Sequence, residues 1–378
     1  MKIDGSPIRD GSVFFIAEAG VNHNGDLDRA RELIDAAAET GADAVKFQTF
    51  TTDRLVAEDA PKADYQDDQT GGEADEETTQ RDMLEQYELS EDDHRELLGY
   101  CEDAGITFLS TPFDAESAAF LDDLDIAAIK VGSGELTNHP LLQQIALLDR
   151  PMVVSTGMAT MAEVETAYEA IRDANPEVAV SLLHCVSSYP ADVADVNLRA
   201  MERLDERFDV PVGYSDHTTA VETPAVAVGA GATVVEKHFT LDRSLPGPDH
   251  EASLEPDELA RAVELAREAA AARGTPEKEP VETERENRTI ARKSLHAARP
   301  VEAGETLTED AVAVLRPATG LSPAELDAVL GEEVETDLER HDPIPADAID
   351  ADVSDGGVSD GDVTGGDAIA DESRASPR

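Results

Sequence analysis

Ionisable and hydroxyl residues recur directly after short apolar segments, and their types suit the binding of a small anion. Lys46 and Lys130 each lie one residue before the end of such a segment, although the chain contains only seven lysines. Cations that converge with hydroxyl groups can bind a phosphate and a carboxylate together. The other polar residues in this position are Glu18, Asn22, His23, Gln48, Ser110, Thr111, Ser133, Glu135, Ser155, Thr156, His184, Ser187, Tyr189, Ser215, Asp216, His217, Glu236, Lys237 and His238.

Two of these histidines, His217 and His238, follow consecutive apolar segments. Imidazoles at the ends of neighbouring strands can share one divalent metal ion. The alternative is a pair of hydrogen-bonded histidines that line the rim of a site. We favour the metal site. We expect Cys185 to be buried in packing rather than nucleophilic, because no base is assigned to it.

The apolar segments that carry these residues alternate with amphipathic helical patterns. Most segments contain consecutive apolar residues, which is typical of parallel strands buried on both faces. Eight strand–helix units over about 270 residues predict a (β/α)8 barrel, whose active site lies at the carboxyl ends of its strands. A doubly wound sheet is the alternative, but it needs a glycine-rich first turn, which is missing after Ala17. The expected strands are Val13–Ala17, Ala44–Phe47, Ile106–Leu109, Ala127–Val131, Met152–Val154, Ala179–Leu183, Val210–Gly213 and Thr233–Val235.

Helices are expected where a capping residue precedes an amphipathic pattern and a glycine often follows it. Ser90 before Glu91 and Gly105 after Ala104 are an example. The expected helices are Leu27–Thr40, Glu91–Ala104, Met161–Ala174, Thr223–Gly229 and Pro256–Arg273.

Changes in composition divide the chain further. Residues 1–274 form the expected barrel domain, in which the polar stretch Val56–Arg81 is expected to be a long loop over the mouth. Residues 275–290 are charged and contain two prolines, and we interpret them as a linker. Short segments within 291–350 predict a small β-rich domain, and the acidic tail at 351–378 is expected to be disordered.

The chain is extremely acidic. It has 30 basic and 83 acidic residues, a formal charge of −53, so nucleic acid and anionic membranes are poor partners. An acidic surface keeps a protein soluble in concentrated salt, which predicts a halophilic source. Two cysteines, no leader segment and no apolar run of membrane-spanning length predict a soluble cytoplasmic protein.

The order of these motifs resembles that of the sialic acid synthases of the neuraminate and legionaminate type, over almost the whole chain except the tail. The segment from about Ala291 to Asp350 resembles the antifreeze-like (SAF) domain of those enzymes, here of a halophilic archaeal type. The motifs that carry the resemblance are Ile16–Gly25, Val45–Gln48, Ser110–Phe113, Lys130–Glu135, Ser155–Met158, Gly213–Thr218, Glu236–Thr240 and Pro246–His250.

The resemblance implies an activity, namely the metal-dependent condensation of phosphoenolpyruvate with an N-acylated mannosamine-type sugar to give a nonulosonate and phosphate. It implies a divalent metal ion at His217 and His238, Mn²⁺ first, with Mg²⁺ or Co²⁺ as alternatives. It also implies a domain-swapped homodimer in which Arg316 reaches the N-acyl group of the sugar. Glu18, Lys130, Glu135 and His217 would be catalytic, and the substrate-binding residues would be Lys46, Gln48, Thr111, Ser133, Ser155, Tyr189, Ser215, Asp249 and Arg316.

Three alternatives stay open at this point. Ser187 stands where many neuraminate synthases have Asn, so the acceptor is either N-acetylmannosamine or a legionaminate-type diacetamido-trideoxyhexose. A Schiff-base aldolase on the same barrel would use Lys130 or Lys237 as its nucleophile. A non-catalytic sugar-binding protein would bind the sugar without releasing phosphate.

The charge generates a first prediction. Self-repulsion among the acidic residues is screened at molar salt and strengthens as salt is removed. The melting temperature should therefore be higher in molar than in millimolar KCl, which thermal melts monitored by circular dichroism will measure. Equal melting temperatures would count against a halophilic source.

Overall fold

Residues 1–58, 60 and 79–349 are described by the computed structural model of the chain. They belong to two compact units, Met1–Thr275 and Pro276–Arg378. The predicted tail and most of the predicted loop at Val56–Arg81 lie outside the described residues. No helix in the described part of the chain is long and apolar enough to cross a membrane.

The first unit is a closed barrel of parallel strands in the order β10-β3-β4-β5-β6-β7-β8-β9. Consecutive strands pair with each other, and β10 closes the ring by pairing with β3. The predicted (β/α)8 barrel is thereby confirmed. The strands are β3 (Phe14–Gly20), β4 (Ala44–Thr49), β5 (Thr107–Pro112), β6 (Ile129–Val131), β7 (Met152–Ser155), β8 (Val180–Cys185), β9 (Val212–Asp216) and β10 (Val234–His238).

Several strands extend beyond the apolar segments from which we predicted them. Strand β3 continues to Gly20 and β10 continues to His238, so Glu18 and Glu236 lie within strands rather than after them. The apolar run ends where the side chains inside the barrel become polar, whereas the backbone pairing continues for two or more residues.

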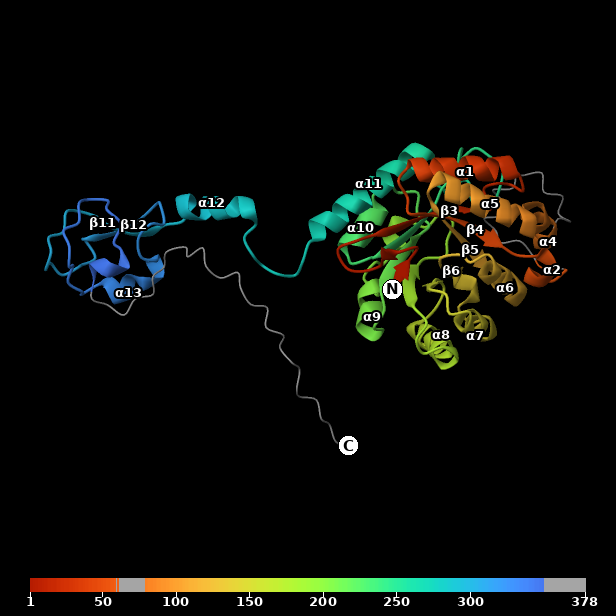
Figure 1. Ribbon diagram of the computed structural model, residues 1–378, viewed down its shortest axis with the longest axis horizontal. Coiled ribbons are helices and arrows are strands. Elements are labelled where there is room, and N and C mark those ends of the chain that lie inside the picture. The colour runs from red at the N-terminus through yellow and green to blue at the C-terminus, as the bar shows by residue number, and fades with distance from the viewer. Residues whose placement is uncertain (59, 61–78, 350–378) are drawn as a thin grey trace, which may run out of the picture. The chain divides into compact units, whose positions relative to one another are not determined.

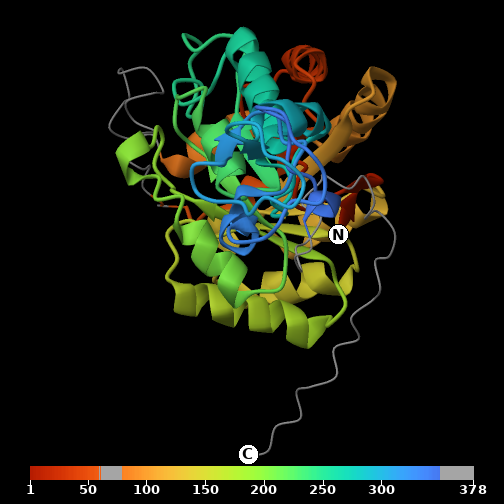
Figure 2. The same ribbon diagram turned by 90° about the vertical axis from the view of Figure 1, so that its left-hand side faces the viewer.

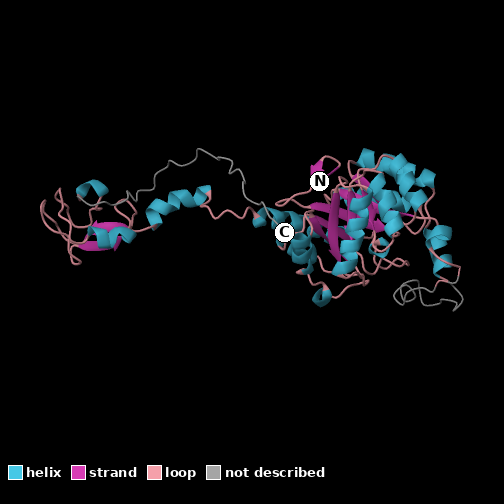
Figure 3. Cartoon of the chain, turned by 90° about the horizontal axis from the view of Figure 1, so that it is seen from below, coloured by secondary structure: helices cyan, strands magenta, loops and turns pink. Residues whose placement is uncertain are grey.

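Helices cover the outside of the strands, as Figure 1 and Figure 2 show. In Figure 3 the magenta strands of this unit are enclosed by cyan helices. The expected helices are all present, and the short helices α2, α4, α6, α7 and α9 of this unit are additional. The helices of the first unit are α1 (Leu27–Glu39), α2 (Thr52–Leu55), α4 (Gln80–Leu84), α5 (Glu91–Ala104), α6 (Ala115–Asp123), α7 (His139–Leu147), α8 (Met161–Ala174), α9 (Ala200–Arg207), α10 (Thr223–Gly229) and α11 (Pro256–Arg273).

Local sequence explains where such helices begin and end. The Ser90 hydroxyl accepts a hydrogen bond from the backbone N–H of Asp93, whose carboxylate accepts one from the backbone of Ser90. This reciprocal cap starts α5, and Gly105 ends it with a φ of 74°, a left-handed conformation that favours glycine.

A short hairpin of β1 (Lys2–Ile3) and β2 (Ser6–Pro7) packs against the inside of the barrel. Ile3 and Ile8 join one buried cluster with the interior residues, whereas a larger cluster lies between the strands and the helices. The interior of the barrel is therefore filled with apolar side chains on the side of the hairpin. The interior members of this cluster are Phe14, Ile16, Ala44, Leu109, Ala128, Val153, Leu183 and Val234.

The second unit is small and rich in antiparallel pairing, as predicted. Strands β11 (Ser294–Ala297) and β12 (Val312–Leu315) pair antiparallel, and α13 (Leu326–Val329) follows. Leu295, Leu307 and Ile344 belong to its own buried apolar cluster. Helix α12 (Glu282–Ala291) occupies much of the segment that we interpreted as a linker.

Two buried histidines of the first unit, His23 and His250, are held neutral. Burial lowers the pKa of each to about 4, with the nearby Arg29 acting in the same direction. His94 also lowers the pKa of His23, whereas Asp26 and Asp93 oppose the shift. The Nδ1 atom of His23 accepts a hydrogen bond from the backbone N–H of Gly25 at 3.0 Å, so it has no room for a proton.

These histidines predict a loss of stability in acid. Below a pH of about 6.5 the unfolded chain protonates them and the folded chain does not, so folding becomes less favourable until the folded pKa near 4 is reached. The free energy of unfolding should fall by roughly 1.4 kcal/mol per pH unit for each histidine, and should not depend on them above that range. Denaturant titrations at a series of pH values will measure the slope. His23→Gln keeps an acceptor but cannot titrate, so an unchanged slope in this variant would contradict the assignment.

Candidate active site

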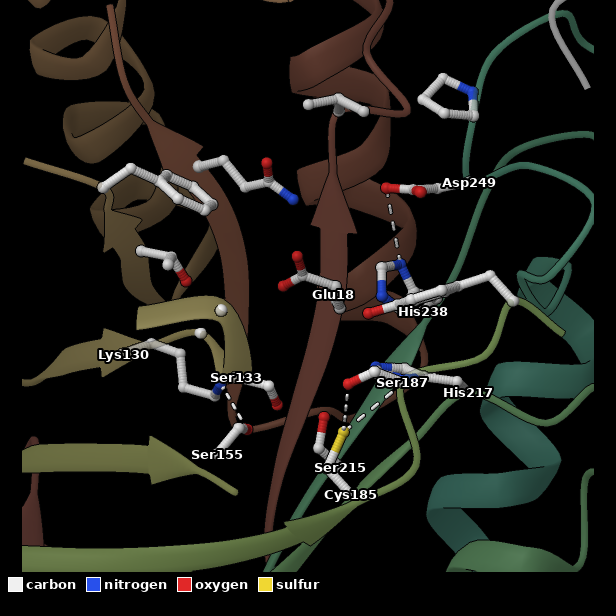
Figure 4. Close-up of a pocket in the computed structure, with 18 of the residues that line it drawn as sticks. Glu18, Lys130, Ser133, Ser155, Cys185, Ser187, Ser215, His217, His238 and Asp249 are labelled. Carbon is white, nitrogen blue, oxygen red and sulfur yellow. Dashed lines mark hydrogen bonds and ion pairs between the residues drawn. The ribbon is translucent and has the colours of Figure 1, made fainter. Parts of the chain in front are cut away.

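A cavity of about 480 Å³ lies at the carboxyl ends of the barrel strands. Figure 4 shows side chains from different strands converging on it, among them Glu18, Lys130 and His217. This is the end at which barrel enzymes place their active sites. All eight strands contribute a side chain to the lining, so the polar residues predicted at the strand ends are brought together.

The lining follows from the alternation of side chains along each strand. Successive side chains point to opposite faces, so every second residue points into the barrel. Ile16 is inside the apolar cluster, and Glu18, two residues further along, lines the cavity. The same step holds on every strand. The pairs, each an interior residue and the lining residue two positions later, are Ile16 and Glu18, Ala44 and Lys46, Leu109 and Thr111, Ala128 and Lys130, Val153 and Ser155, Leu183 and Cys185, Gly213 and Ser215, and Val234 and Glu236.

Two lysines and two glutamates form a buried charge cluster in this polar layer. The ammonium of Lys46 lies 2.8 Å from Glu18 and 3.7 Å from Glu236. The ammonium of Lys130 lies 3.5 Å from the other oxygen of Glu236. All four side chains are almost completely buried. The two positive and two negative charges compensate one another, which burial requires.

The two carboxyl groups differ in their protonation. Burial raises the pKa of Glu18 to about 7, because the attraction of Lys46 only partly offsets the loss of water. Burial also disfavours the ionised form of Glu236, but Lys130 and Lys46 together outweigh it and lower its pKa to about 2. Glu236 is therefore a permanent anion, whereas Glu18 can change its charge near neutral pH.

Hydroxyl groups hold the two ammonium groups in place. Lys46 donates to Thr111 and Lys130 donates to Ser155, each at 2.8 Å. The Ser215 hydroxyl donates to Glu236, also at 2.8 Å. These six residues form one connected network that faces the cavity, with cations and hydroxyls of the kind that bind a phosphate.

The space above this network depends on a glycine. The Ser133 hydroxyl accepts a hydrogen bond from the backbone N–H of Gly157 at 3.0 Å. A Cβ atom at Gly157 would clash with the hydroxyls of Ser133 and Ser187. The glycine thus allows both hydroxyls to lie at the lining of the cavity.

The two histidines predicted to bind metal lie side by side at the cavity. The ring centres of His217 and His238 are 5.4 Å apart. His217 donates from Nδ1 to the backbone carbonyl of Val186 at 2.8 Å, and its ring stacks on Tyr189 at 4.2 Å. That hydrogen bond leaves the lone pair of Nε2 free for a ligand role.

These residues fit a divalent cation. Burial lowers the pKa of His238 far below its usual value, so the ring is neutral, as a metal ligand must be. Its Nδ1 is buried without a hydrogen-bond partner, and the carboxylate of Asp249 lies 4.0 Å away. The described residues contain no group of three or more His, Cys, Asp and Glu side chains arranged to hold a metal. A cation here would bind to the two histidines and complete its ligands with water or substrate.

The other predicted residues fall into two groups. Gln48, Tyr189 and Asp249 line the cavity. Glu135 does not, because it lies in the turn of 3-10 helix after β6 and its carboxylate accepts a hydrogen bond from Asn138 at 2.7 Å. Arg316 lies in the second unit with an exposed side chain, and its role toward the sugar stays a prediction.

Lys237 is oriented away from the cavity. It is completely buried, forms an ion pair with Asp216 at 2.7 Å, and is absent from the lining. Of the two lysines considered as Schiff-base nucleophiles, only Lys130 therefore faces the site. Glu236, by contrast, is a lining residue to which we assigned no role from the sequence, although the step of two from Val234 could have identified it.

One wall of the cavity is apolar. It consists of Leu55 from α2, Met83 and Leu84 from α4, Val56, and Phe113 after β5. Met83 and Phe113 also belong to one small apolar cluster with Leu55 and Leu84. The cavity thus has a charged floor, a histidine pair and an apolar wall.

A (β/α)8 barrel with this mouth defines an enzyme class that acts on small anionic substrates with the help of a cation. A family model described as NeuB family matches residues 33–278, and one described as SAF domain matches residues 292–350. The chain belongs to the NeuB family, the phosphoenolpyruvate-condensing nonulosonic acid synthases, which use a divalent metal ion. The resemblance seen in the motifs is confirmed.

Similar proteins span nearly the same length. The N,N'-diacetyllegionaminic acid synthase of Legionella pneumophila is 45% identical over 345 residues, which cover 89% of this chain and 95% of that protein. The human N-acetylneuraminate-9-phosphate synthase is 36% identical over 333 residues, covering 88% of this chain and 91% of that protein. The crystal structure of N-acetylneuraminic acid synthetase from Leptospira borgpetersenii, in complex with citrate, aligns with a TM-score of 0.65 at 34% identity. It covers 73% of this chain and 90% of that chain.

The histidine pair generates a prediction. His238→Ala should abolish Mn²⁺ binding and lower the rate of phosphate release on the order of a thousandfold, because a metal Lewis acid contributes several kcal/mol to such a step. Calorimetry with Mn²⁺ and a phosphate-release assay after EDTA treatment will test this. His139→Ala, on α7 outside the cavity lining, is the control and should change neither. Full activity of the metal-free natural enzyme would contradict the assignment.

Proposed function

We propose that this chain condenses phosphoenolpyruvate with an N-acylated mannosamine-type sugar aldehyde and water, giving a nonulosonate and inorganic phosphate. One observation carries the proposal. Lys46 and Lys130 are buried in the same cavity that His217 and His238 line. The first pair suits an anionic donor, and the second pair suits a cation that binds the oxygen of an aldehyde.

The donor is assigned to the network on the floor of the cavity. Lys46 and Lys130 would bind the phosphate and carboxylate of phosphoenolpyruvate, with the hydroxyls of Thr111, Ser155 and Ser215 as further donors. Ser133 lies beside them. Ammonium–phosphate hydrogen bonds are charge-assisted, and they strengthen where water is excluded.

His217 and His238 are assigned to the metal ion, for which we propose Mn²⁺ with Mg²⁺ or Co²⁺ as alternatives. When bound, the cation supplies Lewis acidity toward the oxygen of the sugar aldehyde. Tyr189 fixes the ring plane of His217 by stacking, and Asp249 lies beside His238. Both would also face the sugar.

The reaction forms one carbon–carbon bond and one carbon–oxygen bond to water, and it breaks the carbon–oxygen bond to the phosphate. Carbon 3 of phosphoenolpyruvate bonds to the aldehyde carbon, and the aldehyde oxygen takes a proton. Water adds to carbon 2 and loses one proton; its remaining proton passes to the leaving phosphate as the bond from carbon 2 to the phosphate oxygen breaks and the keto group forms. Glu18, with its pKa near 7, can accept or donate one of these protons at neutral pH, and Glu236 remains ionised to balance the lysines as phosphate leaves.

The apolar wall favours a legionaminate-type acceptor within this class. Lys46 and Lys130 are the lysines or arginines among the described lining residues, and both belong to the floor. Among the described lining residues, a phosphate group on the far end of the sugar would thus find no cation beside Leu55, Met83 and Leu84. A 6-deoxy sugar with a terminal methyl group would instead bury that methyl against the wall. The legionaminic acid synthase from Legionella shares the most identity among the relatives described above.

Phosphate release distinguishes these acceptors. The enzyme should release phosphate from phosphoenolpyruvate only when a sugar is present, fastest with 2,4-diacetamido-2,4,6-trideoxymannose, more slowly with N-acetylmannosamine, and slowest with its 6-phosphate. Release with no dependence on any N-acyl sugar would refute the proposed function. Trapping of the enzyme by borohydride with substrate would instead favour a Schiff base at Lys130.

A variant of the wall tests its role. Leu84→Lys places a cation at the apolar wall, so the ratio of kcat/KM for the deoxy sugar to that for the 6-phosphate should fall by at least about tenfold, since one charged hydrogen bond contributes 1.5–3 kcal/mol. Steady-state kinetics with both sugars measure the ratio. Leu147→Lys, at an exposed position on α7, is the matched control. An unchanged ratio in Leu84→Lys would show that the wall does not contact the far end of the sugar.

A further inference from the structure

A completely buried ion pair lies directly behind the two histidines assigned to the metal. Asp216 precedes His217 at the end of β9, and Lys237 precedes His238 at the end of β10. Their side chains have no exposed surface, and Lys237 Nζ lies 2.7 Å from Asp216 Oδ2. The ion pair therefore links β9 to β10 directly beside the two histidines.

The register of the strands determines which residues form this ion pair. Asp216 and Lys237 are direct partners in the parallel pairing of β9 with β10, and Ser215 pairs with Glu236 one position earlier. Ser215, His217, Glu236 and His238 line the cavity, whereas Asp216 and Lys237 do not. A shift of either strand by one residue would break the ion pair and turn a histidine away from the cavity.

The pair also fixes the chain on the far side of His217. The ammonium of Lys237 donates to the backbone carbonyl of Thr218, to its hydroxyl at 3.2 Å, and to the carbonyl of Ala220 at 3.2 Å. Asp216 accepts from the backbone N–H of Thr218 at 2.9 Å. His217 therefore lies between Asp216, a member of the ion pair, and Thr218, which is hydrogen-bonded to both members.

Stability alone is a weak reason for such a pair. Two charges removed from water lose hydration that their attraction repays only in part, and apolar residues of similar volume often stabilise a core as well or better. Val235, the preceding outward-facing residue of β10, belongs to the apolar cluster between the strands and the helices, whereas the Tyr214 hydroxyl of β9 donates to Asp216 at 3.3 Å. The ion pair fixes the register of β9 against β10, which apolar packing would not do.

We propose that Asp216 and Lys237 are positioning residues, which lock β9 and β10 in the register that places His217 and His238 on one cation. The proposal rests on the metal assignment within the proposed function, and it concerns residues that touch neither the cation nor the substrates. Removal of the pair should loosen the histidines while leaving them in the chain.

The test is the double variant Asp216→Asn with Lys237→Met, which removes both charges together and keeps an acceptor for Thr218. Its Kd for Mn²⁺, measured by calorimetry without substrates, should rise about ten- to a hundredfold, as for other residues that orient metal ligands. The absorption spectrum of bound Co²⁺ should change as well. KM for phosphoenolpyruvate at saturating Mn²⁺ should not change, because the lysines on the floor are untouched.

Matched variants separate positioning from general stability. Asp122→Asn with Arg150→Met removes a half-buried ion pair between α6 and the start of β7, and it should change the melting temperature without changing the Kd for Mn²⁺. Lys237→Arg keeps the charge but cannot fit the same four acceptor atoms, so it should weaken Mn²⁺ binding even if the double variant fails to fold.

Each outcome decides a separate claim. A folded double variant with the Kd of the natural chain for Mn²⁺, or an equal change in the Asp122–Arg150 control, overturns the positioning role. A natural chain that binds no Mn²⁺ overturns it too, together with the metal assignment. A natural chain that binds Mn²⁺ but makes no nonulosonate refutes only the proposed function.

Discussion

The alternation of side chains along parallel strands is the constraint on which the site depends. Neighbouring strands are hydrogen-bonded in a staggered register, which sets inward side chains of one strand beside inward side chains of the next, such as Glu18 beside Lys46 and Ser215 beside Glu236. One step of two residues takes every strand from the apolar interior of the barrel to the polar residues of the cavity, and a second step takes β9 and β10 to His217 and His238. The residues between these steps point outward and pack against the helices. The site therefore needs no irregular backbone for its charged groups, only a change of residue type at fixed positions.

The polar layer places two positively charged side chains in a buried site. Two ammonium groups in a buried site would repel each other and lose their hydration, and Glu18 and Glu236 offset that cost in the absence of substrate. The two carboxylates are not equivalent. Glu236 is held ionised between both lysines, whereas Glu18 contacts Lys46 and is close to its titration point at neutral pH. In the proposed function, the anionic donor would replace Glu18 at Lys46, because protonation of Glu18 removes a charge that would otherwise oppose it. The ion pairs thus stabilise the buried lysines and are compatible with the proposed binding of the donor.

The sequence predicts the barrel and most of the cavity lining because both depend on local pattern. Buried parallel strands give uninterrupted apolar runs, and the residues that end them are recognisable by type. The type of a residue, by contrast, does not show whether its side chain points into or out of the barrel. Glu236 and Lys237 are adjacent and both ionisable, and only the step from Val234 tells that the first points inward and the second outward. Glu135 follows a strand in the same way, but a turn of 3-10 helix directs it to Asn138. The apolar wall could not be predicted, since α2 and α4 reach the cavity through tertiary packing that no local pattern records.

The use of lysine or arginine reflects different requirements for a cation in the interior and at the surface of this protein. The chain has 30 basic residues of which seven are lysines, and Lys46, Lys130 and Lys237 are completely or almost completely buried. A guanidinium is planar and holds a carboxylate with two parallel hydrogen bonds, which makes it a good partner for permanent surface pairs. A lysine ammonium is compact and can turn its three donors toward whatever lies around it. Lys46 uses this freedom to share Glu18, Glu236 and Thr111, and Lys237 uses it to bond to Asp216, Thr218 and Ala220. In the proposed function, the same freedom would let the ammonium on the floor of the cavity exchange a carboxylate for a phosphate, which a two-point guanidinium pair would resist. Lys46, Lys130 and Lys237 thus lie where a cation must fit a crowded interior, whereas Lys2, Lys278 and Lys293 are exposed.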